Sequence, residues 1–360
     1  MLEKILCAMS GGVDSSVAAF LLAQEGYDVV GGMMKLYNGD EELEGSLKSC
    51  CTAESAGDAA SVCAELDIPF YVFNLTQQFD ECVIKPFTQF YQSGKTPNPC
   101  LNCNKYLKFQ YLFDKALSLG CGKIATGHYA RIERQGERYF LKRALDRTKD
   151  QSYALYMLTQ NQLAHTLFPL GNYSKEQIRE IAKENKIITY DKQESQDICF
   201  VPNGKYAEFL EANGLNPVAG NFIDENGKVL GSHSGTHNFT IGQRKGLGVS
   251  AEHPLFVKRI DSTNGAVTLC QGEKLYTKRL SCKEINFTAT NALTTPLKAT
   301  AAVRYRGKEE QCVVHQTSED TMVVEFENPI RAITPGQACV IYDGDVVVGG
   351  GVIERAETVL

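Results

Sequence analysis

The sequence has no apolar run long enough to cross a membrane, and its first residues do not form a signal peptide either. Only five apolar residues, Ile5 to Met9, precede polar Ser10. Low-complexity tracts and internal repeats are also missing, and a hydrophobic content of 43% is too high for a disordered or collagen-like chain. We therefore expect a cytoplasmic protein with no membrane partner, whose 360 residues form two or three domains and act as a monomer.

A disulfide scaffold and an overall positive charge are absent as well. The thirteen cysteines are an odd number scattered along a long chain, a pattern typical of thiols in a reducing compartment. The net charge of -6 argues against a nucleic-acid partner, but residues 95–149 hold twelve lysines and arginines against four acidic residues, a local charge of +8. This basic segment fits an anionic polymer, and an ordinary solvated surface is the alternative.

Strand-like and helical segments alternate over the first two hundred residues, which predicts a doubly wound parallel sheet of the α/β class in residues 1–205. The expected strands are Lys4–Met9, Tyr27–Lys35, Phe70–Leu75 and Lys123–Tyr129, and the expected helices are Ser15–Gln24, Ala53–Asp67, Gln77–Tyr91, Cys103–Leu119 and Ser174–Asn185. After Asn213, β-branched residues and the turn pairs Asn226-Gly227, Asn264-Gly265 and Asp343-Gly344 predict hairpins. We expect a small β-rich domain over residues 206–277 and a C-terminal β-barrel over residues 278–360.

The most informative segment is Ser10–Ser16, which reads Ser-Gly-Gly-Val-Asp-Ser-Ser directly after the first predicted strand. It lacks the Gly-Lys-Ser/Thr of a Walker P-loop. Two glycines allow the backbone to approach a ligand closely, and Ser15 and Ser16 are suited to cap a helix whose free N–H groups attract anions. The segment therefore predicts a pyrophosphate site, with a structural glycine turn as the alternative. Asp14 would orient Mg²⁺ or the loop itself, or would be an ordinary turn residue.

Residues at the carboxyl ends of the predicted strands would complete an adenine-nucleotide site, because ligands of doubly wound sheets bind there. Met34 and Gly127 occupy such ends and are expected near the adenine or the ribose, with a core methionine and a turn glycine as alternatives. The expected ATP-binding residues are Ala8, Met9, Ser10, Gly11, Gly12, Val13, Asp14, Ser15, Met34 and Gly127.

Further strings extend the pattern beyond this loop. They are Thr96–Asn104, Ala125–Arg131, Lys149–Ser152, Gln196–Pro202 and Thr240–Gly248, with Arg304-Tyr305-Arg306 and Pro335-Gly336-Gln337 later in the chain. Together with Ser10–Ser16 they closely resemble the tRNA-specific 2-thiouridylases. These are PP-loop ATP pyrophosphatases with a HUP-like nucleotide-binding domain, and they replace the C2 oxygen of a wobble uridine with sulfur. In one departure from the family's usual Asn-Pro-Asp, this chain reads Asn98-Pro99-Cys100, so a carboxylate often given a proton-handling role is missing.

The resemblance implies a mechanism and a set of partners. ATP, with Mg²⁺, would adenylate the C2 oxygen and release pyrophosphate into the glycine loop. Cys199 would carry a persulfide delivered by a sulfurtransferase or a cysteine desulfurase, and Cys103 would be the nucleophile, leaving a Cys103–Cys199 disulfide. The residues implied to contact tRNA or its flipped target base are Asn98, Pro99, Cys100, His128, Lys149, Asp150, Gln151, Tyr305, Arg306 and Gln337.

Several alternatives stay open at this point. Cys100, Cys103 and Cys199 supply three thiolates, which could instead hold an iron–sulfur cluster. By composition alone, Cys199 would be a buried core residue and His128 a buried, hydrogen-bonded histidine. A PP-loop ligase or amidotransferase acting on a small carbonyl substrate would explain the glycine loop but not the paired cysteines or the basic segment. A non-catalytic RNA-binding or metal-binding module would leave the intact loop unexplained.

Overall fold

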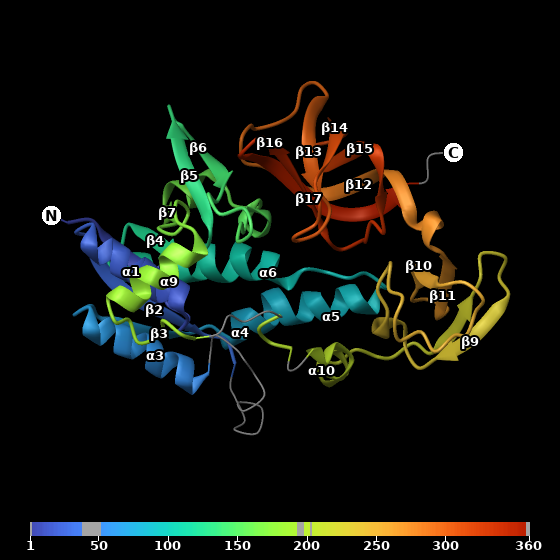
Figure 1. The fold of residues 1–360 in the computed structure, drawn as a ribbon, viewed down its shortest axis with the longest axis horizontal. Helices are drawn as coiled ribbons and strands as arrows, with labels where there is room; N and C mark the ends of the chain where they lie inside the picture. The colour runs from blue at the N-terminus through green and yellow to red at the C-terminus, as the bar shows by residue number, and fades with distance from the viewer. Residues whose placement is uncertain (1, 38–51, 193–197, 202–203, 358–360) are drawn as a thin grey trace. The chain divides into compact units, whose positions relative to one another are not determined.

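The computed structural model describes residues 2–37, 52–192, 198–201 and 204–357, so only residues 198–201 of the string Gln196–Pro202 lie within the described part. The chain divides into two compact units (Figure 1). The first unit contains Met1–Val83, Cys100–Gly204 and Asp345–Val347, and the second contains Ile84–Pro99, Lys205–Gly344 and Val348–Leu360. Residues 84–99 therefore separate from the rest of the predicted α/β segment and belong to the second unit.

The first unit is built on a five-stranded parallel sheet with the order β3-β2-β1-β4-β7. Its strands are β1 (Lys4–Ala8), β2 (Asp28–Lys35), β3 (Phe70–Asn74), β4 (Lys123–Thr126) and β7 (Thr166–Leu167). The central strand β1 pairs with β2 on one side and with β4 on the other, both in parallel. The predicted parallel α/β sheet is confirmed, and the direction of strand addition reverses at β1.

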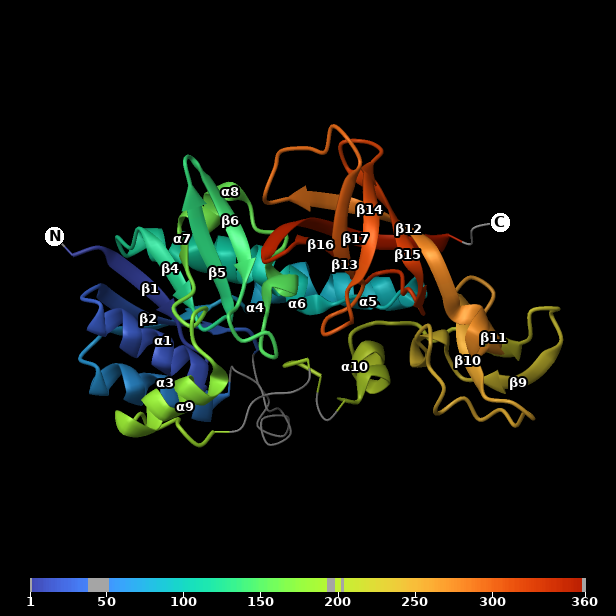
Figure 2. The same ribbon diagram turned by 45° about the horizontal axis from the view of Figure 1, so that its top comes forward.

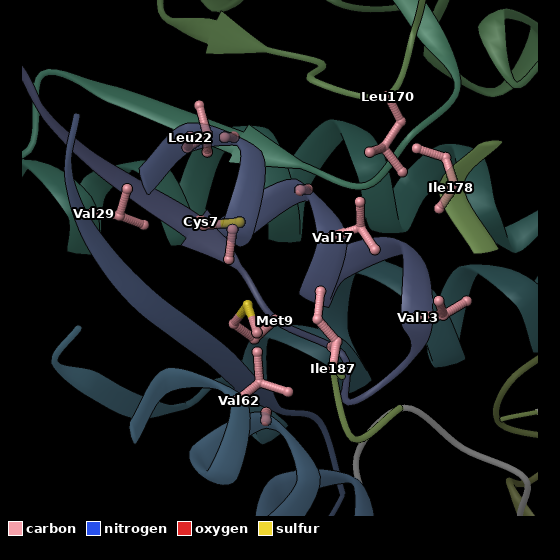
Figure 3. Close-up of a cluster of buried hydrophobic side chains, with 14 of the residues drawn as sticks. Cys7, Met9, Val13, Val17, Leu22, Val29, Val62, Leu170, Ile178 and Ile187 are labelled. Atoms are coloured by element: carbon pink, nitrogen blue, oxygen red, sulfur yellow. The ribbon is translucent and has the colours of Figure 1, made fainter. Parts of the chain in front are cut away.

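Helices α1 (Val13–Gln24), α3 (Ala53–Glu65) and α9 (Lys175–Glu184) contribute to one buried cluster with the sheet. Side chains alternate along a strand, so Cys7 of β1 and Met9, just after this strand, enter the cluster, as Figure 3 shows, while the equally buried Leu6 faces the other side. Helix α7 (Leu112–Ser118) contacts β1 and β4. The continuous apolar run Ile5–Met9 therefore has its physical cause in a sheet that is buried on both faces.

Two of the predicted helices are wrong in their interior. The stretch expected over Gln77–Tyr91 consists of α4 (Thr76–Phe79), a π-helical turn over Asp80–Ile84, and α5 (Lys85–Gln92). The stretch expected over Cys103–Leu119 consists of a π-helix over Cys103–Tyr111, which α6 (Pro99–Asn102) precedes and α7 follows. The reason is that apolar spacing reports a helix but not whether its hydrogen bonds run from i to i+4 or to i+5.

The expected strand Lys123–Tyr129 is also shorter than predicted, because β4 ends at Thr126. The chain then forms an antiparallel hairpin that is absent from the predicted elements, β5 (Ala130–Gln135) and β6 (Arg138–Arg143), visible in Figure 2. A 3₁₀ turn (Ser152–Leu155) and α8 (Gln160–Ala164) lead from this hairpin to β7. The hairpin and the loop after it carry a large part of the basic segment.

The second unit contains α5, α10 (Tyr206–Ala212) and a four-stranded sheet with the order β10-β11-β8-β9. The strands are β8 (Gly220–Ile223), β9 (Val229–His233), β10 (Leu255–Asp261) and β11 (Ala266–Gln271). The turn pairs Asn226-Gly227 and Asn264-Gly265 join β8 to β9 and β10 to β11, as predicted, and both glycines have positive φ. Short 3₁₀ turns over Thr236–Asn238 and Gly272–Leu275 are the exceptions to the all-β texture expected after Asn213.

The C-terminal strands of the second unit close into a barrel, which confirms the predicted architecture. The strands are β12 (Tyr276–Phe287), β13 (Leu297–Ala302), β14 (Glu310–Gln316), β15 (Thr321–Arg331), β16 (Ala338–Asp343) and β17 (Val346–Glu357). They follow the order β12-β15-β14-β13-β16-β17, and β17 pairs with β12. Within the described residues of both units, no helix is both long enough and apolar enough to span a membrane.

Candidate functional site

The carboxyl ends of β1 and β4 meet at the point where the strand order reverses, which is where doubly wound sheets bind ligands. Ser10 follows β1 and Gly127 follows β4. A Cβ at Gly127 would lie 2.9 Å from the carbonyl carbon of Asp14 and 3.0 Å from the nitrogen of Ser15. Only glycine therefore lets the end of β4 approach the start of α1, and the structure brings these predicted residues together.

The turn between β1 and α1 depends on its first glycine. Gly11 has φ +69°, and a Cβ at this position would lie 2.3 Å from the carbonyl oxygen of Ser55, in the first turn of α3. Gly12 is the N-cap of α1 and has extended backbone angles, φ -106° and ψ 164°. The loop is thus pressed against α3 at a spacing that a larger residue could not occupy.

The predicted capping of α1 by Ser15 and Ser16 is wrong. The helix begins at Val13, two residues earlier than expected, so both serines lie inside its first turns, and their hydroxyls each donate to the carbonyl oxygen of Gly12 at 3.0 Å. A capping side chain must precede the helix, and none of the described side chains fills that role at α1. The N–H groups at the start of α1 therefore remain suited to an anion.

Asp14 in the first turn of α1 is held by two donors on the same oxygen. The Tyr129 hydroxyl donates to Asp14 Oδ1 at 2.8 Å, and Lys175 Nζ donates to it at 2.7 Å. The Lys175 side chain is only 6% exposed, while that of Asp14 is 31% exposed. Because a buried ammonium already neutralises this carboxylate, the geometry favours an Asp14 that orients the loop over an Asp14 that binds Mg²⁺.

The remaining predicted ATP residues fall into two groups. Met9 and Val13 place their side chains in the hydrophobic cluster, so the backbone is the part of each that a nucleotide could meet. Ala8 ends β1, Ser10 is exposed, and Met34 lies half-buried in β2 beside Phe73 of β3. These positions line the same carboxyl edge of the sheet, as the sequence predicts.

The segments that carry Cys103 and Cys199 share a support. Asn102, which precedes Cys103, donates through Nδ2 to the carbonyl oxygen of Cys82 at 3.0 Å. Phe200, which follows Cys199, packs edge-on against Phe79, with ring centroids 5.5 Å apart. Because Phe79 ends α4 and Cys82 lies in the π-turn that follows, both cysteine segments rest on one helical turn. Both cysteines are half-buried, so the alternative of Cys199 as buried filler does not describe it.

The iron–sulfur alternative is not supported. It needs Cys100, Cys103 and Cys199 close enough together to bind one cluster. Within the described residues, which include all three, no group of three or more histidine, cysteine or acidic side chains could hold a metal ion. Cys100 is exposed, unlike the other two.

His128 is buried near the helix that carries Cys103, with the ring centroids of Phe109 and Phe168 each 6.0 Å from its own. Its Nδ1 is 2.7 Å from Thr126 Oγ1, and its Nε2 is 3.3 Å from Nζ of Lys108. Burial and the nearby Lys108 hold the pKa of His128 well below its usual value, so the ring is neutral and Nε2 accepts a hydrogen bond from the lysine. The expected alternative, a buried and hydrogen-bonded histidine, describes this environment, and contact with tRNA stays a prediction.

The loop between β6 and the 3₁₀ turn is tightly braced by Asp150. The Asp150 carboxylate accepts hydrogen bonds from the backbone of Ala144, at 3.0 Å, and from the backbone and hydroxyl of Ser152, and it lies 3.6 Å from the guanidinium of Arg143. It therefore organises the loop, and a negative group so engaged is a poor partner for phosphate.

A neighbouring residue fastens the same loop to the segment between β4 and β5. Gln151 exchanges two hydrogen bonds with the backbone of Tyr129, one through its side-chain oxygen at 2.9 Å and one through its own N–H at 2.8 Å. Lys149 lies between Asp146, whose carbonyl accepts its N–H, and Asp150. Of the three residues predicted here, Lys149 is thus the one whose charge suits phosphate.

Tyr305 and Arg306, both predicted to contact tRNA, lie in the loop after β13 of the second unit. The Arg306 guanidinium stacks 5.4 Å from the centroid of the Tyr305 ring, and Tyr305 is 36% exposed. Arg306 has φ +58°, a conformation that an arginine rarely adopts. An exposed aromatic ring beside a guanidinium is suited to stacking with a base or binding a phosphate.

Gln337 instead fixes a backbone segment. Its Nε2 donates to the carbonyl oxygen of Thr96 at 2.7 Å, and the Thr96 N–H donates to the carbonyl of Pro335 at 3.0 Å. These bonds hold the irregular segment that leads to Asn98, which is half-buried, and Pro99, which is buried. Gln337 is therefore placed to position the predicted base-contacting residues of its own unit.

Sequence reasoning missed Tyr129 and Lys175, although both contact Asp14. Tyr129 lies inside the string Ala125–Arg131, so its neighbours offered a signal. Lys175 is the first residue of α9, after a capping box of Ser174 and Gln177 that is a common helix start. Nothing in the local pattern distinguishes Lys175 from a surface lysine.

Comparison with known proteins covers almost the entire chain. Residues 3–203 match a family described as tRNA methyl transferase HUP domain, residues 207–271 its PRC-barrel domain, and residues 277–353 an aminomethyltransferase β-barrel domain. The chain is 46% identical over 361 residues to the tRNA-specific 2-thiouridylase MnmA of Clostridioides difficile, covering 99% of both chains. It is 46% identical over 357 residues to MnmA of Clostridium beijerinckii, covering 98% of this chain and 99% of the relative.

A parallel sheet with a glycine loop and an uncapped helix start at its switch point defines a PP-loop type of nucleotide-binding domain, here joined to two β-rich modules. Identity of this extent across nearly the full length narrows the class to one family. The chain belongs to the tRNA-specific 2-thiouridylase (MnmA) family. A ligase for small carbonyl substrates and a non-catalytic module are not favoured.

Proposed function

We propose that this protein uses ATP to replace the C2 oxygen of a tRNA uridine with sulfur. The observation that carries the proposal is the start of α1, an uncapped, glycine-built anion site at the switch point of the sheet, in a chain whose relatives are 2-thiouridylases over their whole length. The family resemblance places the target uridine at the wobble position.

The first step activates a poor leaving group. The uridine C2 oxygen attacks the α-phosphorus of ATP, the bond to the β-phosphate oxygen breaks, and pyrophosphate departs. The N–H groups of the Gly12–Ser15 turn stabilise the charge that develops on the departing pyrophosphate. Asp14, held by Tyr129 and Lys175, keeps this turn in place, and Mg²⁺ would travel with the nucleotide phosphates.

The second step exchanges sulfur for the adenylated oxygen. The terminal sulfur of a Cys199 persulfide attacks C2 and AMP leaves, which joins the base to Cys199 through a disulfide. The Cys103 thiolate then attacks the Cys199 sulfur, releases 2-thiouridine and leaves a Cys103–Cys199 disulfide, which a dithiol must reduce before the next turnover. The shared support formed by Phe79 and Cys82 favours this pairing.

Lys108 supports the reactive form of Cys103. In a π-helix the hydrogen bonds join residues i and i+5, so Lys108 lies on the turn that follows Cys103. The neutral imidazole of His128 accepts a hydrogen bond from Lys108 and so fixes its ammonium group. A fixed cation next to a thiol favours the thiolate.

This proposal includes the tRNA contacts, the domain boundaries and the partners that the sequence predicts. Lys149, Tyr305 and Arg306 would bind phosphate or stack with bases, while Asp150, Gln151 and Gln337 would hold the contacting segments. A sulfurtransferase or cysteine desulfurase would load Cys199. We propose a cytoplasmic monomer with domains over residues 1–205, 206–277 and 278–360.

Reconstituted thiolation under anaerobic conditions tests the proposal. Purified protein, ATP, a persulfide source and an unmodified tRNA transcript should yield 2-thiouridine, AMP and pyrophosphate. Cys103→Ser and Cys199→Ser should each lower the rate by on the order of a thousandfold or more, because each removes a group that forms a covalent bond. Cys103→Ser should also accumulate a protein–tRNA disulfide that a reductant releases.

Cys82→Ser is the matched control. Cys82 is half-buried like Cys103, and only its backbone carbonyl contributes to the support, so this variant should keep its activity. Full activity of Cys103→Ser or Cys199→Ser would contradict the sulfur relay. ATP–pyrophosphate exchange that needs no RNA would instead favour a small carbonyl substrate.

A further inference from the structure

The hydrogen-bond network around Asp14 joins two regions with different expected ligands. One is the glycine loop at the start of α1, and the other is the loop of residues 146–151, which contains Lys149. Both belong to the first unit, and two residues outside them, Tyr129 and Lys175, each bond to Asp14 on one side and to the 146–151 loop on the other.

The first route passes through Tyr129. Its hydroxyl donates to Asp14 Oδ1 at 2.8 Å, while its backbone N–H donates to Gln151 Oε1 at 2.9 Å and its carbonyl accepts the Gln151 N–H at 2.8 Å. Tyr129 is buried, so its own donors and acceptor in these bonds are shielded from water. Any displacement of Gln151 is thereby passed to the residue that holds Asp14.

The second route passes through Lys175. Its ammonium donates to the same Asp14 oxygen at 2.7 Å and lies 5.8 Å from the centroid of the Tyr129 ring. Its backbone N–H donates to Asp146 Oδ2 at 3.1 Å. Asp146 also binds the backbone and hydroxyl of Thr148, so the start of the 146–151 loop is fixed to the same lysine.

The 146–151 loop is stiff enough to transmit a displacement. Asp146 organises its first half and Asp150 its second, through bonds to Ser152 and Ala144. Two separate routes therefore connect one compact loop to one carboxylate oxygen in the ATP site. When the first ligand binds, it orders the shared network, so the second ligand binds without that entropic cost and with higher affinity. Because binding free energies are linked, each ligand raises the affinity of the other by the same factor.

We propose that Tyr129 and Lys175 are positioning residues that couple tRNA binding to ATP binding through Asp14. This inference rests on the proposed function, since it takes residues 149–151 as part of the tRNA site. The coupling would make the glycine loop competent for adenylation mainly when a tRNA is bound, which limits unproductive cleavage of ATP.

The test is a binding cycle on the full-length protein. The probes are α,β-methylene ATP, which cannot lose pyrophosphate, and an unmodified tRNA transcript with uridine at the wobble position. In the wild type, saturating tRNA should lower the Kd of the nucleotide by about tenfold, within the range of about 5- to 150-fold usual for coupled sites, and the nucleotide should lower the Kd of tRNA by the same factor. In Tyr129→Phe the factor should fall to threefold or less, and with Lys175→Met added it should approach one.

Tyr27→Phe is the control. Tyr27 precedes β2, so it lies at the opposite, amino-terminal edge of the same sheet, and removing its hydroxyl should leave the coupling factor at the wild-type value. A coupling factor near one in the wild type, or an unchanged factor in both Tyr129→Phe and the double variant, would overturn the proposal. If the wild type thiolates no tRNA at all, the proposed function fails and the coupling fails with it. If the wild type thiolates tRNA but the coupling factor gives one of these refuting results, only the coupling proposal fails and the proposed function stands.

Discussion

The sharpest test of the glycine loop is the substitution Gly11→Ala, since the structure gives two separate reasons why this variant should lose stability and affinity for the nucleotide. Gly11 has φ +69°, in the left-handed region that costs a residue with a Cβ about 1–2 kcal/mol. Its added Cβ would also lie 2.3 Å from the carbonyl oxygen of Ser55, more than 1 Å closer than the 3.4 Å of ordinary contact. Both atoms are backbone or directly attached to it, so the loop itself must move away from α3.

Gly26→Ala separates the two effects. Gly26 follows α1 with φ +85°, but a Cβ there would meet nothing within 4 Å. It carries the conformational cost alone, partly offset because alanine restricts the unfolded chain, so we expect a loss of about 1 kcal/mol in the free energy of unfolding. Gly11→Ala should lose clearly more, and its affinity for α,β-methylene ATP should fall by more than about tenfold, equivalent to 1.4 kcal/mol.

Two measurements check this prediction. Urea unfolding gives the stability of both variants, and isothermal titration gives the affinity for the nucleotide. Gly26→Ala should bind within about twofold of the wild type, because it lies at the far end of α1. If Gly11→Ala binds the nucleotide as tightly as Gly26→Ala does, the glycine loop is not the phosphate site.

Two further predictions concern charge and pH. Lys149→Ala should weaken tRNA binding regardless of sequence and reduce the slope of log affinity against log salt by about 0.7–0.9, and an unchanged slope would exclude a phosphate contact. Because burial and Lys108 keep the pKa of His128 well below 6.5, only the unfolded chain takes up a proton at this position as the pH falls below 6.5, and stability drops by up to about 1.4 kcal/mol per pH unit. His128→Gln should remove that part of the slope in urea unfolding between pH 7.5 and 5.5. The lowered pKa of His233 adds a slope of the same sign to both proteins, so equal slopes would contradict the assignment.

The fold could be predicted from the sequence where one pattern had one physical meaning. Alternating apolar runs and helical stretches require a sheet buried on both faces, and the glycine turn pairs after Asn213 require hairpins. The glycine loop was found because two adjacent glycines stand directly between an apolar strand and a helix start, although the close approach of Gly11 to Ser55 is visible only in the structure. The hairpin pairs and the glycine motif depend on neighbouring residues. These features are local, so a single sequence reveals them.

The rest depends on contacts between distant residues. Asp14 meets Lys175 only after the chain has folded, so the choice between a magnesium ligand and a loop-orienting residue lay outside the reach of the sequence. Asp150 matched a tRNA-contacting position, yet its carboxylate is occupied by Ser152 and Ala144. A motif match fixes which residues belong to a site, but their hydrogen-bond partners decide which of them bind the ligand and which hold the others.

The π-helix over Cys103–Tyr111 shows how backbone geometry can choose a catalytic neighbour. In an α-helix the side chain four residues on, Leu107, would lie over Cys103, and an apolar neighbour raises the pKa of a thiol. The i to i+5 hydrogen bonds of the π-helix pair Cys103 with Lys108 instead, and Leu107 is fully buried. The lysine is in turn fixed by His128, whose ring stays neutral because of its burial. Under the proposed function, the unusual helix would therefore have a chemical consequence, because it places a cation held by His128, and not a leucine, on the turn after the nucleophile.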